Sequence, residues 1–153
     1  MKMAAAASQT RTDAGLATEL RISVSRLARR LRAARVARGV ATELSDTQLA
    51  ALAALERHTA MTPGELAEHE KVQPPSMTRV IAALQERGLV TRAPHPTDGR
   101  QVKLTVTEQG RELVQQSRRL REAWLAQRLR ELSPEERAAL RAAAPILQRL
   151  SQS

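Results

Sequence analysis

The residues best suited to chemistry form a short polar cluster in the middle of the chain. An amide, two hydroxyls and a guanidinium occur within seven positions, around a pair of prolines. Such groups hydrogen-bond to base edges and phosphates, and an arginine can contact guanine through two hydrogen bonds. We therefore expect the following residues to bind nucleic acid: Gln73, Pro74, Ser76, Thr78 and Arg79.

Structural roles for the same side chains remain open. Gln73, Ser76 and Thr78 could instead cap a helix or bond to nearby backbone groups, as short polar side chains often do. Arg79 could form an ion pair within the chain.

A second candidate group surrounds an arginine in a predicted turn. Residues 94–100 read Pro-His-Pro-Thr-Asp-Gly-Arg, a turn-forming composition between two segments with strand character. This pattern predicts a β-hairpin with Arg100 at its tip, where a guanidinium can enter a narrow minor groove of DNA. Arg87 and Arg92 precede the tip and could either contact phosphates or support the hairpin. The strands are predicted at 89–92 and 101–106.

Two short helices must position the polar cluster. Thr62-Pro63-Gly64-Glu65 is a helix start, with a threonine cap, a proline at the first helical position and a glutamate three residues after the cap. Pro74-Pro75-Ser76 opens the next helix, which Gly88 ends. Because only a few residues separate the helices, they must cross, which predicts a helix-turn-helix. In that arrangement the first turns of the second helix reach base edges in the major groove.

Longer helices are predicted on both sides of these elements. An apolar stripe from Leu16 to Leu31 predicts a helix over 16–38, which carries seven arginines and one glutamate. We interpret the arginines as a solvated face, with a phosphate-contacting or acidic-partner role as the alternative. Further helices are predicted to begin at capping residues Ser45, Thr107 and Ser133. The predicted division is a flexible segment 1–15, a helix 16–38, a DNA-binding lobe 45–106 and C-terminal helices 107–153.

Composition limits the kinds of function. The chain has 153 residues, a net charge of +9 and no cysteine. The positive charge suggests a polyanionic partner, and the lack of cysteine excludes disulfides, thiolate metal sites and thiol redox sensing. No apolar run approaches the ~20 residues of a membrane span, and the N-terminus does not resemble a signal peptide. We therefore expect no membrane association and a cytoplasmic location.

Neither an enzyme nor a metalloprotein is expected. The sequence offers no nucleophile–base pair, glycine-rich phosphate loop or convergent carboxylates, so no catalytic residue is assigned. The three histidines are scattered along the chain, although His58 and His69 could approach each other in space. Without cysteine, or a carboxylate at helical ligand spacing, we expect no metal site and no cofactor.

The long helices carry more apolar surface than the central lobe can cover. We therefore expect them to pack against their counterparts in a second copy. A two-fold homodimer is the commonest closed assembly of this kind.

With the elements in this order, the chain resembles the MarR family of winged helix-turn-helix transcription regulators, from Leu16 to the C-terminus. Five stretches carry the resemblance: LSDTQL at 44–49, MTPGELA at 61–67, PPSMTR at 74–79, LQERGLV at 84–90, and DGR at 98–100 followed by LTVTEQG at 104–110.

The resemblance implies a mainly α fold of about six helices plus a small β-hairpin wing, with long N- and C-terminal dimerisation helices. It also implies a homodimer that binds double-stranded DNA at a pseudo-palindromic operator and represses or otherwise adjusts transcription. The recognition helix, about 74–87, would enter the major groove and the wing, 94–100, the minor groove. In the family pattern Asp98 helps hold the hairpin and its arginine. Relatives often have two basic residues after this aspartate, whereas Gly99 takes the first position here and leaves Arg100 as the minor-groove residue.

Sensing is the least determined property. Relatives bind small aromatic or anionic effectors in a crevice beside the dimerisation helices, and Trp124 could line such a crevice or pack in a core or dimer interface. Response to a small molecule and response to no ligand both remain open. A winged helix used for protein contact is the alternative function class, and the polar cluster at 73–79 argues against it.

Overall fold

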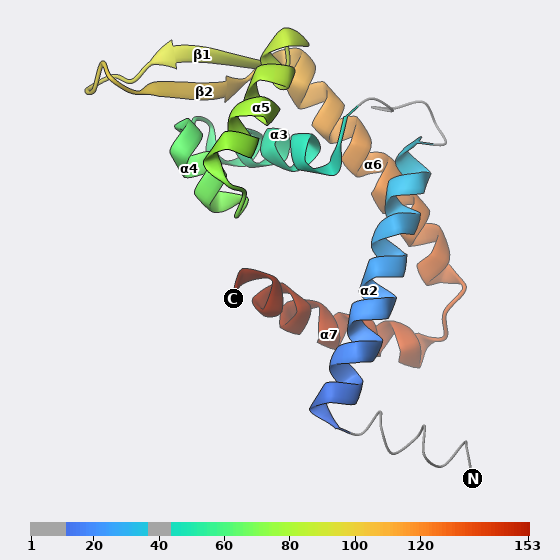
Figure 1. Ribbon diagram of the computed structural model, residues 1–153. Coiled ribbons are helices and arrows are strands. Elements are labelled where there is room, and N and C mark those ends of the chain that lie inside the picture. The colour runs from blue at the N-terminus through green and yellow to red at the C-terminus, as the bar shows by residue number, and fades with distance from the viewer. Residues whose placement is uncertain (1–11, 37–43) are drawn as a thin grey trace. The chain divides into compact units, whose positions relative to one another are not determined.

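The computed structural model describes residues 12–36 and 44–153 of the chain. Within them it contains six helices and one two-stranded antiparallel sheet (Figure 1), which confirms the mainly α fold with a small hairpin. The helices are α2 (Asp13–Val36), α3 (Asp46–His58), α4 (Pro63–His69), α5 (Pro74–Glu86), α6 (Glu108–Arg130) and α7 (Pro134–Gln152); the strands are β1 (Val90–Pro94) and β2 (Val102–Val106). None of the helices in the described residues is long and apolar enough to cross a membrane.

The described chain forms two compact units. The first contains the described residues up to Ala34 together with Leu120–Ser153, and the second contains Arg35–Arg119. The second unit holds α3, α4, α5, the hairpin and the start of α6, and we call it the lobe.

Helix α2 begins earlier than its apolar stripe predicts. It starts at Asp13 rather than Leu16, so residues 13–15 are helical and not part of a flexible segment. The reason is local: Thr12 Oγ1 accepts a hydrogen bond from the Gly15 amide at 3.1 Å and caps the helix. Residues 1–11 of the predicted flexible segment, and the predicted end of the helix at Arg38, lie outside the described residues.

Reciprocal capping boxes open three of the helices, as the sequence predicts. The Ser45 hydroxyl accepts from the Gln48 amide at 3.1 Å, and the Gln48 side chain accepts from the Ser45 amide at 2.9 Å. The same exchange occurs at the starts of α4 and α7, where glutamate takes the place of glutamine. Each box satisfies two backbone donors that the helix leaves without partners.

The core of the lobe is aliphatic and joins all its elements. Burying one such side chain contributes roughly 1.5–3 kcal/mol, so α5 is firmly held by its inner face. The large side chains that are fully buried in α3, α4, α5 and β2 are Leu52, Leu55, Leu66, Met77, Ile81, Leu84 and Leu104.

Helix α5 ends in a Schellman motif. The Leu89 amide donates to the Leu84 carbonyl at 3.0 Å and the Gly88 amide donates to the Gln85 carbonyl at 2.9 Å. Gly88 has φ 69°, a conformation that glycine adopts without a steric cost.

Helix α4 ends in the same motif without a glycine. The Val72 amide donates to the Ala67 carbonyl at 2.9 Å, and the Lys71 amide donates to the Glu68 carbonyl at 3.1 Å. Lys71 takes the left-handed position with φ 52°. The motif redirects the chain within a few residues, so that α5 can begin at Pro74.

Helix α3 ends at a tight turn that leads to the sheet. Thr59 has φ 65° and ψ −53°, and the Ala60 amide donates to the His58 carbonyl at 2.7 Å. This γ-turn with positive φ is rare and strained. It places Met61 beside Leu104 of β2, with backbone hydrogen bonds of 3.1 and 2.7 Å between the two residues.

The start of α6 is packed closely against the base of the hairpin. The Thr107 hydroxyl accepts from the Gly110 amide at 3.1 Å and donates to the Gly88 carbonyl at 2.7 Å. A Cβ at position 110 would collide with the Leu89 carbonyl oxygen and lie 2.8 Å from Val106 Cγ2. Only glycine allows this approach, which fixes the hairpin at its base.

Candidate nucleic-acid interface

The first turns of α5 present a polar surface. Gln73, Pro74, Ser76, Thr78 and Arg79 are all exposed, as the sequence pattern predicts. Between them Met77 is fully buried and anchors the turn to the core. The inward residues fall at helical spacing, so the intervening polar side chains must face outward.

The alternative local roles apply to one of these side chains. Thr78 Oγ1 donates to the Pro74 carbonyl at 2.9 Å, a bond within the helix. Gln73 is the N-cap residue of α5 but makes no capping hydrogen bond with its side chain. Its amide therefore remains available to an external partner.

Arg79 has no internal ion pair. Among the residues that the structure describes, its guanidinium contacts no acceptor. An ion pair within the chain is one of the two sequence-based interpretations of Arg79, and it is not observed there. An exposed guanidinium without an internal partner can bind an external base or phosphate in bidentate geometry.

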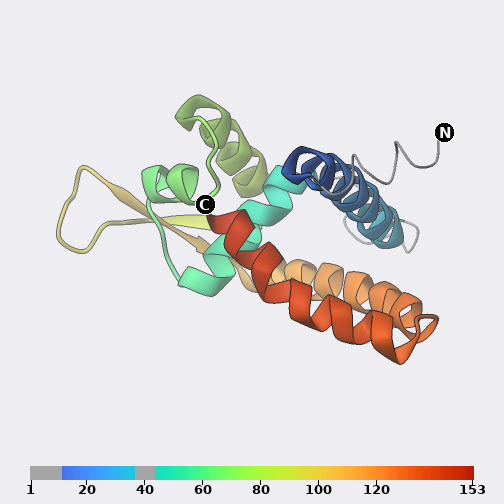
Figure 2. The same ribbon diagram turned by 90° about the horizontal axis from the view of Figure 1, so that it is seen from below.

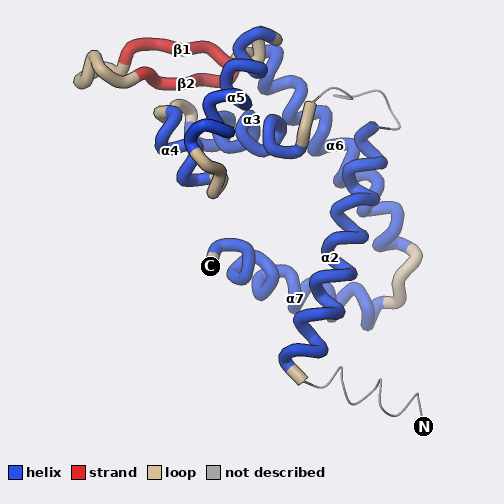
Figure 3. The backbone as a smooth tube through the Cα atoms, in the orientation of Figure 1, coloured by secondary structure: helices blue, strands red, loops and turns tan. Residues whose placement is uncertain are grey.

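The hairpin projects from the helices of the lobe. Strands β1 and β2 pair in register from Val90 with Val106 to Pro94 with Val102. Figure 2 shows the strands and their loop extending beyond α3, α4 and α5, and Figure 3 shows the loop as an irregular segment between two strands. A projecting hairpin with an exposed tip is suited to reach a groove beside the one that a helix occupies.

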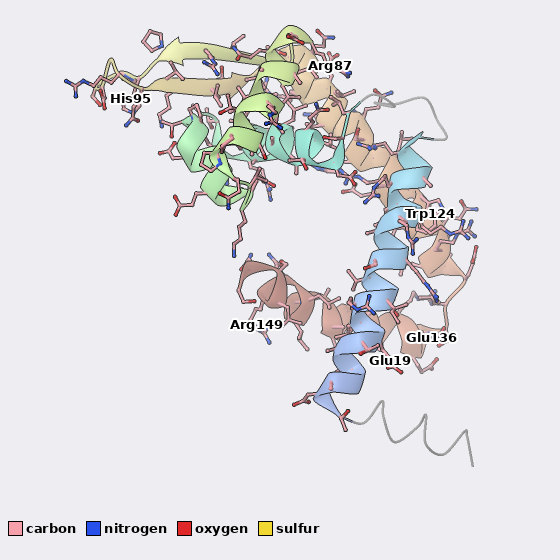
Figure 4. All side chains as sticks on the ribbon, viewed as in Figure 1. Glu19, Arg87, His95, Trp124, Glu136 and Arg149 are labelled. Carbon is pink, nitrogen blue, oxygen red and sulfur yellow. The ribbon has the colours of Figure 1, made fainter. Side chains whose placement is uncertain are left out.

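One imidazole organises the loop of the hairpin. His95 Nδ1 accepts hydrogen bonds from the backbone amides of Thr97 and Asp98, both at 3.2 Å. The His95 amide itself donates to the Gln101 carbonyl at 3.1 Å and closes the loop. Figure 4 places His95 in the loop at the end of the hairpin. Sequence reasoning treated this residue only as part of a turn; its acceptor role depends on backbone geometry that no residue pattern encodes.

Asp98 and Arg100 are linked through the backbone of the loop. Asp98 Oδ1 accepts from the Arg100 amide at 3.1 Å, and the Asp98 carbonyl accepts from the Gln101 amide at 3.0 Å. The carboxylate thus holds the backbone and not the guanidinium. The Arg100 side chain is exposed and has no ion-pair partner within the described ranges 12–36 and 44–153.

Arg87 and Arg92 also lie on the outside of the lobe. Arg87 is the C-cap residue of α5, where Figure 4 labels it, and Arg92 lies in β1 opposite Leu104. Both side chains are exposed. A cation at the end of a helix interacts favourably with the helix dipole, so Arg87 has a structural role in addition to any external contact.

A salt bridge ties the wing to α4. Lys103 Nζ lies 3.3 Å from Glu65 Oε2, the same oxygen that accepts from the Thr62 amide at 2.7 Å. The Thr62 backbone amide and then the Lys103 ammonium lower the pKa of Glu65 below its ordinary value. Both interactions favour the charged carboxylate, so one glutamate caps α4 and holds β2.

The arginines of α2 do not form one solvated face. Arg35 is only 3% exposed, contrary to the sequence-based interpretation. Its Nη2 donates to the Leu44 carbonyl at 3.4 Å and lies 3.6 Å from Asp46 Oδ1. The groups at the start of α3 therefore compensate for the burial of its charge in part, since Arg35 Nη1 is buried without a hydrogen-bond partner. Arg21, Arg26, Arg29 and Arg30 are exposed, and Arg38 lies outside the described residues.

Trp124 belongs to the unit outside the lobe and is partly buried. The Arg128 guanidinium lies 5.6 Å from the centre of its ring, within the range of a cation–π interaction, and is paired with Glu131 at 2.7 Å. Figure 4 labels Trp124 on α6. One face of the indole is thus occupied by a side chain from the next helical turn.

The histidines are arranged partly as expected. His58 and His69 do approach each other, with 3.2 Å between their Nε2 atoms. In the described part of the chain no group of three or more histidine, cysteine, aspartate or glutamate side chains could hold a metal ion.

Comparison with known proteins agrees with this architecture. The family model described as MarR family matches residues 44–102, which include the helix-turn-helix and most of the hairpin. A relative from Mycobacterium bovis, the uncharacterized HTH-type transcriptional regulator Mb0904, is 52% identical over 136 residues, which cover 89% of this chain and 92% of the relative.

Solved structures share the fold. RV1404 from Mycobacterium tuberculosis matches with a TM-score of 0.79 and 27% identity, over 91% of this chain and 94% of that one. A mutant MarR from E. coli, crystallised in complex with operator DNA, matches with a TM-score of 0.65 and 23% identity, over 84% and 93% of the two chains. The long, highly identical alignment, the family match and the shared fold lead to one assignment: the chain belongs to the MarR family of helix-turn-helix transcription regulators.

Proposed function

We propose that the protein acts as a homodimeric repressor that binds a pseudo-palindromic operator in double-stranded DNA. The proposal rests chiefly on one observation: Arg79 and Arg100 are both exposed on the lobe and neither has an internal partner within the described residues. A recognition helix and a wing that each present one uncommitted guanidinium can engage adjacent grooves of one duplex.

The start of α5 is assigned to the major groove. Its exposed side chains offer donors and acceptors of the kinds that read base edges, and Met77 beneath them keeps the helix rigid. Arg79 is the candidate for bidentate contact with guanine. Gln73 and Ser76 are candidates for base or phosphate contacts. Thr78, which already donates to the Pro74 carbonyl, can still accept a hydrogen bond or present its methyl group to thymine.

The hairpin loop is assigned to the minor groove. The Asp98 carboxylate and the His95 imidazole order the backbone around Arg100, which limits the entropy lost when the guanidinium binds. A narrow, A·T-rich minor groove has an enhanced negative potential that attracts arginine. Arg87 and Arg92 are proposed to contact phosphates.

Dimerisation is assigned to the helices outside the lobe. Apolar side chains remain exposed on α2 and α7, for example Leu16 at 49% and Leu150 at 60%, and no residue of α7 is buried. Two copies related by a two-fold axis could bury these side chains at a gain of roughly 1.5–3 kcal/mol for each one fully covered. The same symmetry would present two recognition helices to a palindromic site.

A small aromatic or anionic effector is proposed to release the DNA. Trp124 is the candidate contact, because an aromatic carboxylate could stack on its ring and replace Glu131 as the partner of the Arg128 guanidinium, which lies 5.6 Å from the ring centre. Since Trp124 is the only tryptophan in the chain, its fluorescence reports such binding directly. Titration with benzoate should quench this fluorescence and lower operator affinity. Quenching without a change in affinity would show that the ligand binds but does not release the DNA.

Selection of bound fragments from random-sequence DNA tests the function as a whole. We expect enrichment of an inverted repeat whose half-sites lie ~10 bp apart or a multiple of that spacing. Affinity for the selected site should fall steeply with salt, by a slope of about −0.9 in log–log form for each phosphate neutralised. Failure to enrich any sequence, or enrichment of isolated half-sites, would contradict the proposed dimeric operator complex.

A further inference from the structure

Two histidines from different helices meet edge to edge on the lobe. His58 is the last residue of α3 and His69 the last of α4, and their Nε2 atoms lie 3.2 Å apart. The ring planes are inclined by 70° with centroids 4.9 Å apart, so the rings are not stacked. The two nitrogens are within hydrogen-bond distance, so in the absence of metal the Nε2–H of one ring donates to the Nε2 lone pair of the other.

Glu70 determines which nitrogen of His69 carries the proton. Its Oε1 lies 3.0 Å from His69 Nδ1, and an ionised carboxylate can only accept a hydrogen bond. Nδ1 of His69 is therefore protonated, and in the neutral ring Nε2 carries a lone pair. That lone pair faces His58 Nε2.

The spacing of the two nitrogens matches a shared metal ion. A tetrahedral ion with Zn–N bonds of about 2.0–2.1 Å holds two ligand nitrogens about 3.3 Å apart. The observed 3.2 Å needs almost no movement of the two nitrogens, and the proton on His58 Nε2 is displaced when the ion binds. A histidine ligand also typically donates its other ring N–H to a carboxylate, which fixes the ring and increases its basicity. Glu70 already makes this contact with His69.

We propose that His58 and His69 bind a divalent late transition-metal ion, Zn²⁺ in the first instance, through their Nε2 atoms, with Glu70 as a positioning residue. Imidazole nitrogen is a preferred ligand of zinc, copper and nickel. The site is open, since His58 is exposed and the His69 side chain is 34% exposed, and water completes the coordination. This two-histidine site is proposed although the sequence pattern predicts no metal site and no group of three or more ligands occurs in the described residues.

Metal binding would add a link between the C-terminal ends of α3 and α4, which already share the core of the lobe. His58 directly precedes the strained turn at Thr59, and His69 directly precedes the Schellman turn that leads to α5. An ion shared by both rings binds the folded lobe and not the unfolded chain, so it must raise the stability of the lobe. This inference does not depend on DNA binding.

Titration of the metal-free full-length protein with Zn²⁺ tests the site. In NMR spectra the ring Cε1–H signals of His58 and His69 should shift or broaden together, and that of His95 should not. The melting temperature should rise with zinc concentration. Unchanged signals of His58 and His69 at millimolar zinc would overturn the proposal.

Variants then separate the site from other zinc-binding groups. His58→Gln and His69→Gln should each weaken zinc binding at least tenfold in a chelator competition, and His95→Gln serves as the matched control. Because both ligands are exposed, we expect each variant to fold, and circular dichroism verifies that it does. Zinc affinity that survives both substitutions would contradict the assignment.

Glu70→Gln tests the positioning role. The amide cannot polarise the imidazole as a carboxylate does, so zinc affinity should fall about tenfold or more. The metal-free variant should melt near the wild-type temperature. If the His69–Glu70 pair had only a structural role, its loss would lower the melting temperature instead. Wild-type zinc affinity in this variant would remove Glu70 from the site.

Discussion

At the scale of single residues, His95 is the centre of the wing. Its Nδ1 accepts from two backbone amides, so the ordered loop requires an unprotonated nitrogen at that position. The nearby Asp98 carboxylate holds the Arg100 amide in the same way. Two side chains that need not touch DNA therefore determine where the arginine lies.

Replacing His95 should disorder the loop without unfolding the lobe. His95→Ala removes both acceptor contacts, but His95 is only partly buried and lies in the loop of the hairpin, outside the core of the lobe, so the effect on global stability should be about 0.5 kcal/mol or less. We expect an unchanged melting temperature, faster hydrogen exchange at the Thr97 and Asp98 amides, and several-fold weaker operator binding. His58→Ala, measured without added metal, is the matched control. Wild-type affinity in His95→Ala would show that loop order does not contribute to binding.

The two free guanidiniums should affect recognition differently. Arg79→Ala should cost about 1–3 kcal/mol of discrimination between operator and random DNA, because a bidentate base contact is lost. Fluorescence anisotropy with both DNAs measures the difference. Equal losses on operator and random DNA would instead identify Arg79 as a phosphate contact.

Arg100→Ala should weaken binding most where the sequence beside the recognition site is A·T-rich. The physical reason is the stronger negative potential of a narrow minor groove. Operators with A·T-rich and G·C-rich flanks, compared for the variant and the wild type, provide the measurement. A loss of affinity independent of the flank would argue against insertion of the wing.

At the scale of elements, α4 and α5 both end in a Schellman motif, but different residues take its left-handed position. Gly88 fills the left-handed position after α5, and Lys71 fills it after α4. A side chain in that conformation costs about 1–2 kcal/mol. The lobe therefore carries a small conformational cost in its turn, beside the surface proposed to bind DNA.

Substitutions at the two left-handed positions should change the free energy of unfolding in opposite directions. Lys71→Gly should stabilise the lobe by up to ~1 kcal/mol, since relief of the left-handed strain exceeds the extra chain entropy of glycine. Gly88→Ala should destabilise it by a similar amount, because space for a Cβ exists and only the backbone conformation is unfavourable. Urea unfolding of both variants supplies the free energies of unfolding. A destabilised Lys71→Gly would mean that the lysine side chain contributes contacts that outweigh the strain.

Contacts between residues close together in the sequence could be predicted from it, and contacts between residues far apart in the sequence could not. The capping boxes at Ser45 and Thr62 follow from side chains three residues apart, and the sequence pattern predicts them correctly. The burial of Arg35 against the start of α3 and the bridge from Lys103 to Glu65 join residues that no local pattern connects. For the candidate interface, the pattern predicts which residues are exposed, but the acceptor role of His95 depends on the folded path of the loop backbone.

At the scale of the whole molecule, the distribution of apolar side chains matters most. The lobe buries its leucines, whereas α7 buries none of its residues and exposes Leu147 and Leu150 at 40% and 60%. An exposed apolar helix face of this kind marks an interaction surface. The proposed homodimer would supply one.

Charges placed on the apolar face of α7 should dissociate the dimer. Leu147→Glu with Leu150→Glu would bury two unpaired carboxylates in the proposed interface, which is strongly unfavourable. We expect a monomer in sedimentation experiments and a loss of operator affinity of tenfold or more, because each lobe would bind alone. Gln148→Glu with Gln152→Glu adds the same charge to the same helix and should leave the dimer intact. A dimeric Leu147/Leu150 variant would place the interface elsewhere.

The scarcity of aromatic side chains determines which spectroscopic signals can follow the unfolding of the protein. Trp124, the only residue among tryptophan, tyrosine and phenylalanine in the chain, belongs to the unit outside the lobe. Its emission therefore gives no direct reading of the aliphatic core around Leu52 and Met77, so the DNA-binding half could melt without a change in fluorescence. Far-UV circular dichroism, which reports helices in both units, would detect that melting, and a mismatch between the two curves would reveal units that unfold separately.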